Sequence, residues 1–93
     1  MTIFDQIAVH IILEQESVIG PLAWEEAKKV AGFRVSDKDK GEVSLEGDPK
    51  EIINRLVAQY SRLFGQVSID LCKGAVGYLL ADLPKTEIPA SLQ

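Results

Sequence analysis

The stretch Asp48–Gly65, DPKEIINRLVAQYSRLFG, decides the fold, because its start, its buried face and its end are all written in residues. The Asp48 carboxylate can accept hydrogen bonds from the first free backbone amides, and Pro49 fits the first helical position. Glu51 stands where a capping box needs an acidic residue. Gly65 supplies the left-handed residue that often ends a helix. The stretch is therefore predicted to be a helix.

The apolar side chains of this predicted helix share one face. At about 100° per residue they fall within an arc of roughly 140°, and polar residues take the other side. The apolar set is Ile52, Ile53, Leu56, Val57, Tyr60, Leu63 and Phe64. We therefore expect this helix to form one wall of the core.

Two helices and a hairpin are predicted before it. Apolar periodicity indicates a helix over residues 2–19, and proline after the break at residues 20–21 starts a second helix over 21–31. Residues 33–46 alternate apolar and polar side chains around the polar turn 37–41, which is typical of a β-hairpin.

The segment after the central helix has two interpretations. Val67, Ile69 and Leu71 alternate with polar residues like a strand, but the longer run to Leu83 suits a helix, and we predict a helix from about residue 67 to 82. The predicted fold is thus a small, mostly helical α+β domain, ordered α-α-β-β-α-α with one β-hairpin.

The domain organisation follows from the same pattern. Residues 1–83 are expected to form a single globular domain. Residues 84–93 contain two prolines and few core residues, so they are expected to form an extended or flexible C-terminal tail.

Three residues are candidates for an interface: Val9, Leu13 and Trp24. Val9 and Leu13 lie about 60° to 100° outside the main apolar arc of the first helix, so that helix is either covered on two sides within its own domain or faces a partner. Trp24, the only tryptophan, is either a core anchor between helices or an interface contact.

Three further residues are candidates for ligand binding or redox chemistry: His10, Glu14 and Cys72. Glu14 lies one helical turn after the only histidine and can orient it as a base. Cys72, beside Lys73, is either a reactive thiol or a buried core residue. No third group completes a catalytic set, so neither catalytic residues nor a cofactor are predicted.

Charge and composition exclude several classes of protein. The net charge of −4 and the absence of a Lys/Arg cluster argue against nucleic acid. No apolar run approaches the roughly 20 residues needed to cross a bilayer. The run Asp37–Gly41 begins like a calcium loop but puts Glu42 where the bend needs glycine, so no metal site is predicted. The single cysteine and the absence of a signal-peptide pattern favour a cytoplasmic location.

These observations favour a non-enzymatic protein-interaction or regulatory module that associates with itself, the expected partner being a second copy in a homodimer. The alternative is a small-ligand-binding protein or minor enzyme that uses His10 with Glu14, or Cys72, in a pocket between helices. A strictly monomeric protein would contradict the first hypothesis. A histidine titration unchanged by Glu14→Gln would argue against the second.

Overall fold

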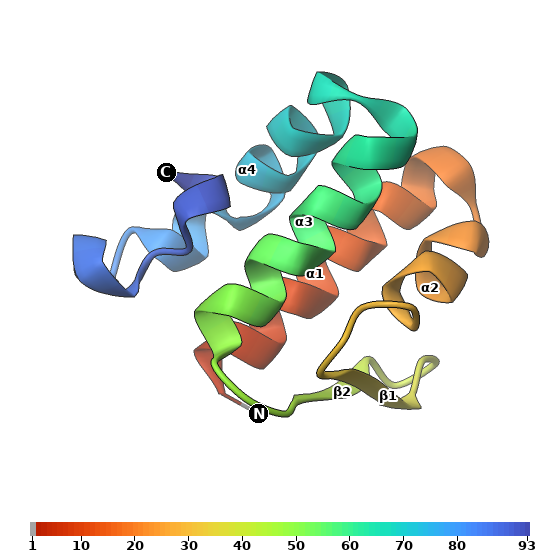
Figure 1. Cartoon of the computed structure of the whole chain (residues 1–93), viewed down its shortest axis with the longest axis horizontal. Coiled ribbons are helices and arrows are strands. Elements are labelled where there is room, and N and C mark those ends of the chain that lie inside the picture. The colour runs from red at the N-terminus through yellow and green to blue at the C-terminus, as the bar shows by residue number, and fades with distance from the viewer. Residues whose placement is uncertain (1) are drawn as a thin grey trace.

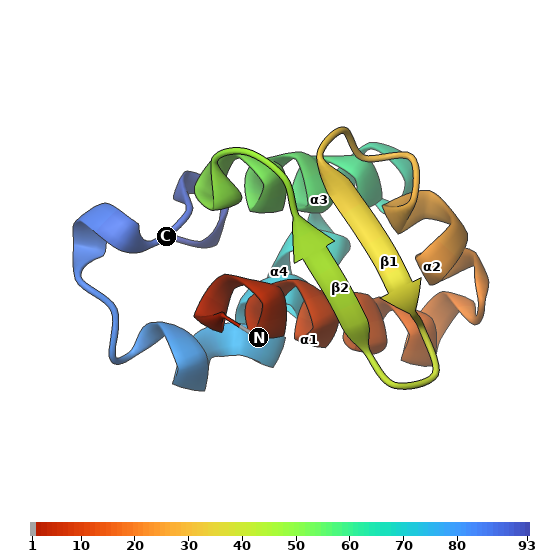
Figure 2. The same cartoon turned by 90° about the horizontal axis from the view of Figure 1, so that it is seen from below.

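The computed structural model describes residues 2–93, and the elements it contains confirm the α+β, mostly helical fold (Figure 1). They are α1 (Ile3–Ile19), α2 (Leu22–Ala27), β1 (Phe33–Asp37), β2 (Glu42–Leu45), α3 (Pro49–Phe64), α4 (Gln66–Leu80) and the 3-10 turns η1 (Lys85–Glu87) and η2 (Ala90–Leu92). Helices α1, α3 and α4 pack on one another, and the hairpin lies against α1 (Figure 2).

Helix α3 begins and ends as its sequence predicts. The Asp48 carboxylate accepts a hydrogen bond from the Lys50 amide at 3.0 Å, and Gly65 ends the helix with φ +80°. Glu51 differs from the prediction, because its carboxylate lies along the helix, 3.9 Å from Nε of Arg55. The predicted apolar face is buried from Ile52 to Tyr60.

Helix α1 is the centre of the core. Thr2 and Asp5 form a capping box at its start, with reciprocal hydrogen bonds of 3.1 and 3.2 Å. Contacts with α2, α3, α4 and β2 surround this helix. Its innermost residues, Ile7, Ala8, Ile11 and Ile12, are fully buried.

Helix α2 is shorter than the predicted 21–31, because the chain must turn early to enter the hairpin. After Ala27 the backbone continues in 3-10-type turns, and Gly32 adopts φ +85°. A Cβ at Gly32 would stand 2.8 Å from the backbone oxygen of Glu46, and the Glu46 amide donates to the Gly32 oxygen at 2.7 Å. This close approach requires glycine at the turn.

The hairpin has the predicted position and turn. Strands β1 and β2 are antiparallel, with Phe33 opposite Leu45 and Val35 opposite Val43. Oδ1 of Asp37 accepts hydrogen bonds from two amides of the turn, at 3.0 and 3.2 Å. Phe33 and Val43 are buried and carry the apolar face of the hairpin to the helices.

The segment that suited either a strand or a helix is α4, a helix from its first residue. Gly65 both ends α3 and precedes α4, so the two helices are joined by a single residue. Ser68, Cys72 and Val76, spaced four apart, form the buried face of α4. Spacing of four places residues on one side of a helix and also on one side of a strand, so these three positions do not by themselves distinguish the two. In the structure this face of the helix packs against α1 and α3.

The C-terminal segment is not the extended or flexible tail that its prolines indicated. Pro84 and Pro89 each precede a short 3-10 turn, and η2 packs against α3 and α4. Pro89 and Leu92 are buried, and Leu92 belongs to the core cluster. A proline cannot continue a regular helix, but its ring is apolar, and the ring of Pro89 is buried here.

Candidate functional site

The predicted pair Val9 and Leu13 is divided by the fold. Val9 is buried, and its Cγ1 would lie 3.4 Å from a Cβ placed on Gly41, so it packs beneath the hairpin turn. Leu13 is 45% exposed. The two-residue apolar surface is therefore corrected to Leu13 alone, because the hairpin covers the other residue.

Trp24 lies in the core and is 2% exposed, which is the core-anchor alternative. It belongs to α2, whose position against α3 is fixed nearby by a hydrogen bond of 2.6 Å from the Tyr60 hydroxyl to the Ala23 oxygen. An interface role for Trp24 would require the core to open.

His10 meets Tyr78 of α4. The Tyr78 hydroxyl lies 3.1 Å from Nε2 of His10, and the two rings meet edge to face with centroids 5.8 Å apart. Glu14 is half-buried on the next turn of α1, and its backbone oxygen accepts a hydrogen bond from the Ser17 hydroxyl. The structure therefore pairs the histidine with a tyrosine that the sequence analysis did not single out.

Cys72 is fully buried between helices. Nε2 of Gln15 donates to the backbone oxygen of Ser68 at 3.2 Å and lies 3.5 Å from the Cys72 sulfur. Burial raises the pKa of the Cys72 thiol from 9.0 to about 11, and the hydrogen bond from Gln15 offsets part of that increase. The thiol is thus kept protonated, which suppresses the thiolate that redox chemistry requires.

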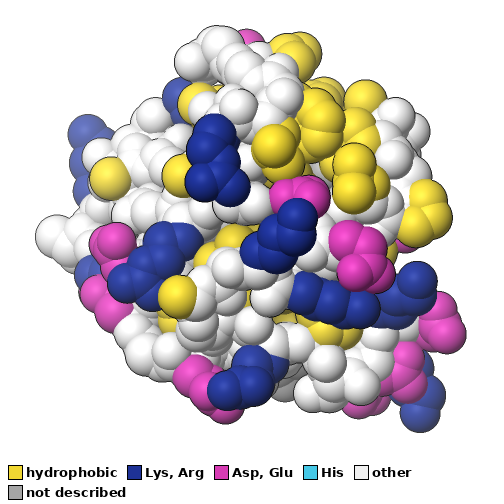
Figure 3. All heavy atoms as spheres, turned by 45° about the vertical axis from the view of Figure 1, so that its right-hand side comes forward, with side chains coloured by type: hydrophobic (Ala, Val, Ile, Leu, Met, Phe, Trp, Pro, Cys, Tyr) yellow, Lys and Arg dark blue, Asp and Glu magenta, His cyan; other side chains and the backbone are white. Residues whose placement is uncertain are grey.

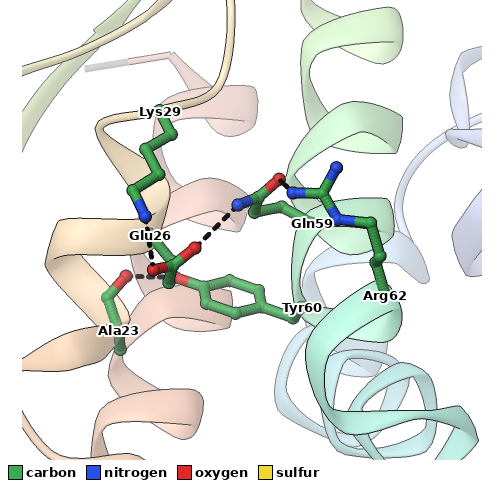
Figure 4. A network of polar contacts seen from close by, with 6 residues as sticks. All are labelled: Ala23, Glu26, Lys29, Gln59, Tyr60 and Arg62. Atoms are coloured by element: carbon green, nitrogen blue, oxygen red, sulfur yellow. Dashed lines mark hydrogen bonds and ion pairs between the residues drawn. The ribbon is translucent and has the colours of Figure 1, made fainter.

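A buried carboxylate joins α2 to α3 (Figure 4). Glu26 points from α2 toward α3 and accepts hydrogen bonds from Nζ of Lys29 at 2.9 Å and from Nε2 of Gln59 at 2.7 Å. Gln59 in turn accepts from Arg62 at 2.7 Å. The bond from Lys29, followed by the bond from Gln59, lowers the pKa of Glu26. Among residues 2–93, no buried side-chain nitrogen or oxygen lacks a hydrogen-bond partner, so the buried atoms of this network are satisfied and we assign the network a structural role.

One end of the molecule carries a group of exposed apolar side chains, which we name the apolar end: Val18, Leu22, Leu63 and Val67. Val18 and Leu22 flank the α1–α2 turn, whereas Leu63 and Val67 flank the α3–α4 turn. These are four of the six large apolar residues that are exposed among residues 2–93.

Two hydrogen bonds hold these turns side by side. Tyr60, one turn before Leu63, bonds to the start of α2, and Gln15, one turn before Val18, bonds to the start of α4. Figure 3 shows hydrophobic side chains gathered at the upper right of the view, over this end, whereas most charged side chains lie lower.

Apolar periodicity along the sequence does not reveal the apolar end, for a physical reason. Leu63 lies on the predicted apolar face of α3, so periodicity predicted that it would be buried, and Val18 lies within the predicted first helix. Each stands in the last turn of its helix, where the chain reverses at Gly20 or Gly65 and no further element covers it. The sequence feature that could have identified these exposed residues is their position beside the two glycine turns.

Helix α4 also presents an unusual outer face. Gly74 and Gly77 are exposed, and a Cβ added to either would meet nothing within 4 Å. Close packing among residues 2–93 therefore does not explain these two glycines.

Residues 2–93 contain no pocket and no cluster of three or more metal-ligating side chains. None of the helices in this part of the chain is both long and apolar enough to cross a membrane. Comparison of the chain with protein-family models, with curated proteins and with solved structures found no match.

Proposed function

We propose that this chain is a non-enzymatic protein-interaction module that associates with a second copy of itself through the apolar end. The observation that carries the proposal is the grouping of Val18, Leu22, Leu63 and Val67 at one end of a small domain. Large contiguous apolar patches are uncommon on the surfaces of monomeric proteins and often mark interaction sites.

The expected association is weak. Full burial of a large apolar side chain contributes about 1.5–3 kcal/mol, and these side chains are already about half covered, so each adds roughly 1 kcal/mol. A symmetric pair buries both copies of the patch and gains roughly 8 kcal/mol, against an association cost of about 4–15 kcal/mol. The dimer should therefore form only at high protein concentration.

The charge of the chain gives the association a characteristic salt dependence. Each copy carries a net charge of −4, so two copies repel each other. Added salt screens this repulsion and leaves apolar burial intact. We therefore expect dimerisation to strengthen as the salt concentration rises, which is the opposite of an interface held by ion pairs.

The experiment is light scattering over a concentration series, with a matched pair of variants. Wild-type protein should rise from the monomer mass of 10.2 kDa toward twice that value. Leu63→Glu should remain monomeric, because it places a charge in the patch. Leu13→Glu is the control, because Leu13 and Leu63 are the same residue type on helices and are 45% and 46% exposed.

A wild-type mass of 10.2 kDa at every concentration would contradict the proposal. Loss of association in Leu13→Glu, with Leu63→Glu unaffected, would move the interface to the side of α1 that carries His10. Circular dichroism of both variants confirms that they remain folded.

The negative charge also supports a protein rather than nucleic acid as the partner, and the single buried cysteine supports a cytoplasmic location. The alternative of a ligand-binding protein or minor enzyme that uses His10, Glu14 or Cys72 stays a prediction. No observation among residues 2–93 favours it.

A further inference from the structure

Residues 84–93 form a small unit closed on itself, which we name the C-terminal hook. Its turns η1 and η2 are tied together by the side chain of Gln93, whose Nε2 donates to the Ile88 oxygen at 3.0 Å and to the Lys85 oxygen at 3.5 Å. Backbone hydrogen bonds within the hook join residues three positions apart in each of the two turns. The hook therefore specifies its own local shape.

The hook presents two apolar anchors to the body of the domain. Pro89 is fully buried, and Leu92 is 5% exposed and belongs to the core cluster. Ala90, between them in sequence, is exposed. The hook thus has an inner side that is buried and an outer side that faces solvent.

Its polar contacts with the body all go to one helix. Oδ1 of Asn54 accepts two hydrogen bonds from Ser91, from the amide at 3.0 Å and from the hydroxyl at 2.7 Å. One turn earlier on α3, Nζ of Lys50 donates to the Thr86 oxygen at 3.1 Å and lies 4.0 Å from the Glu87 carboxylate. Among residues 2–93, the hook makes no hydrogen bond to α4, the helix that it follows.

We name the surface under the hook the seat; it consists of the Lys50 and Asn54 side of α3 and the adjoining side of α4. The seat binds the hook through the side chains of Lys50 and Asn54, which contact backbone and side-chain groups of the hook, so binding depends on the local shape of the hook. The connection from α4 runs through exposed Asp82 and half-buried Leu83, which packs against the core, and Pro84 at the start of the hook favours an extended residue before it. Nothing in these contacts requires that the hook and the seat belong to the same chain.

We propose that the seat is a peptide-binding site that accepts the C-terminal hook of a second copy of this chain when its own hook is released. A second copy is the partner that fits, because its hook carries every group that the seat contacts, including Pro89, Ser91 and Leu92. Exchange of an identical element between two copies is a low-cost route to a dimer. The seat lies at the beginning of α3 and the apolar end lies at its end, so this proposal is independent of the proposed function.

In the closed chain, the short connection gives the attached hook an effective concentration in the millimolar range, so it outcompetes a hook in solution. A peptide should therefore bind well only when the attached hook is weakened. The probe is a fluorescently labelled peptide of residues 84–93, and the readout is its anisotropy on titration with full-length protein.

The receptor variant is full-length Leu92→Glu, which places a charge on the buried anchor of the attached hook. The matched control is Ala90→Glu, which adds the same charge on the exposed side of the hook. We expect the peptide to bind the Leu92→Glu chain at least tenfold more tightly than it binds either the wild-type or the Ala90→Glu chain. A peptide that itself carries Leu92→Glu should not bind.

Full-length Leu92→Ala is a second receptor variant, which weakens the anchor without adding charge, and circular dichroism identifies whichever variant stays folded. The absence of tighter binding to a folded variant would overturn the proposal. Equal binding of the wild-type and Leu92→Glu peptides would overturn it too, because the anchor would then not be recognised.

A mixture of two full-length chains tests the second copy directly. One chain carries Leu92→Glu and keeps an intact seat; the other carries Asn54→Leu and keeps an intact hook. Both also carry Leu63→Glu, so the apolar end does not contribute. The mixture should contain a species of twice the monomer mass that neither chain forms alone. Peptide binding without this species would overturn the assignment to a second copy.

Discussion

Two ionisable groups are held neutral in the core. Burial raises the pKa of Cys72 to about 11, and it raises the pKa of Tyr60 above its ordinary value, with nearby Cys72 and Glu26 adding to the effect. Both groups lose a proton more easily in the unfolded chain. Their contribution to stability is therefore complete at neutral pH and is lost as the pH rises.

The Cys72 contribution should disappear between about pH 9 and 11. A pKa difference of two units corresponds to roughly 2–3 kcal/mol in the free energy of unfolding. Urea unfolding under reducing conditions at pH 8, 9, 10 and 11 should show this fall in the wild-type protein and a smaller one in Cys72→Ala. If both proteins lost the same stability over this range, the thiol would not be the group that titrates.

Glycines with and without room for a side chain should respond in opposite ways to alanine. Gly32→Ala should cost roughly 2 kcal/mol or more, because φ is +85° and the new Cβ would stand 2.8 Å from a backbone oxygen. Gly74→Ala should stabilise by up to about 1 kcal/mol, because its Cβ would enter open space on a helix. Urea midpoints of the two variants test this, and a destabilised Gly74→Ala would show that α4 is not packed as described.

At the scale of elements, the ionised carboxylate of Glu26 stabilises the contact between α2 and α3. The hydrogen bonds from Lys29 and Gln59 lower the pKa of Glu26, so the ionised form stabilises the fold above the ordinary carboxyl pKa. That contribution is lost as the pH falls through the lowered value.

We therefore expect Glu26→Gln to lower the urea midpoint at pH 7, and the difference from wild type to shrink as the pH falls toward 3. Glu25→Gln is the control, because Glu25 is exposed and lies 3.5 Å from exposed Lys28. Such surface pairs contribute little to stability. Equal effects of the two substitutions would contradict the stabilising role assigned to the Glu26 carboxylate.

Much of the element order could be predicted because local signals agreed. Asp48, Pro49 and Gly65 bound α3, and the alternation on either side of Asp37–Gly41 specifies the hairpin. These signals come from residues that are close together in the sequence, so they can be recognised in the amino-acid sequence alone. The buried thiol at Cys72 and the buried Trp24 also follow from the general tendencies of these residue types.

The remaining features depend on contacts between distant segments. Val9 is buried because the hairpin turn at Gly41 covers it, whereas Leu13, one turn later, is left exposed. Leu92 lies in the core, and the adjacent Ser91 hydrogen-bonds to Asn54, which lies 37 positions before Ser91 in the sequence. Periodicity describes the two sides of a helix but does not say which side another element will cover.

At the scale of the whole molecule, the domain offers contact surfaces at both ends of α3. The hook and its seat lie where α3 begins, and the apolar end lies where α3 finishes (Figure 1). Substitution at one end should therefore leave the other unaffected, because distant sites without shared partners act additively.

The most direct test of the apolar end is a dilution series followed by amide proton–nitrogen correlation spectra of the wild-type protein. If two copies meet through this surface, concentration-dependent shifts should cluster at Val18, Leu22, Leu63 and Val67 and their sequence neighbours. Amides of β1 and β2 should stay unchanged. Spectra that do not change with concentration, or changes centred on Leu13 and Tyr78, would contradict the account.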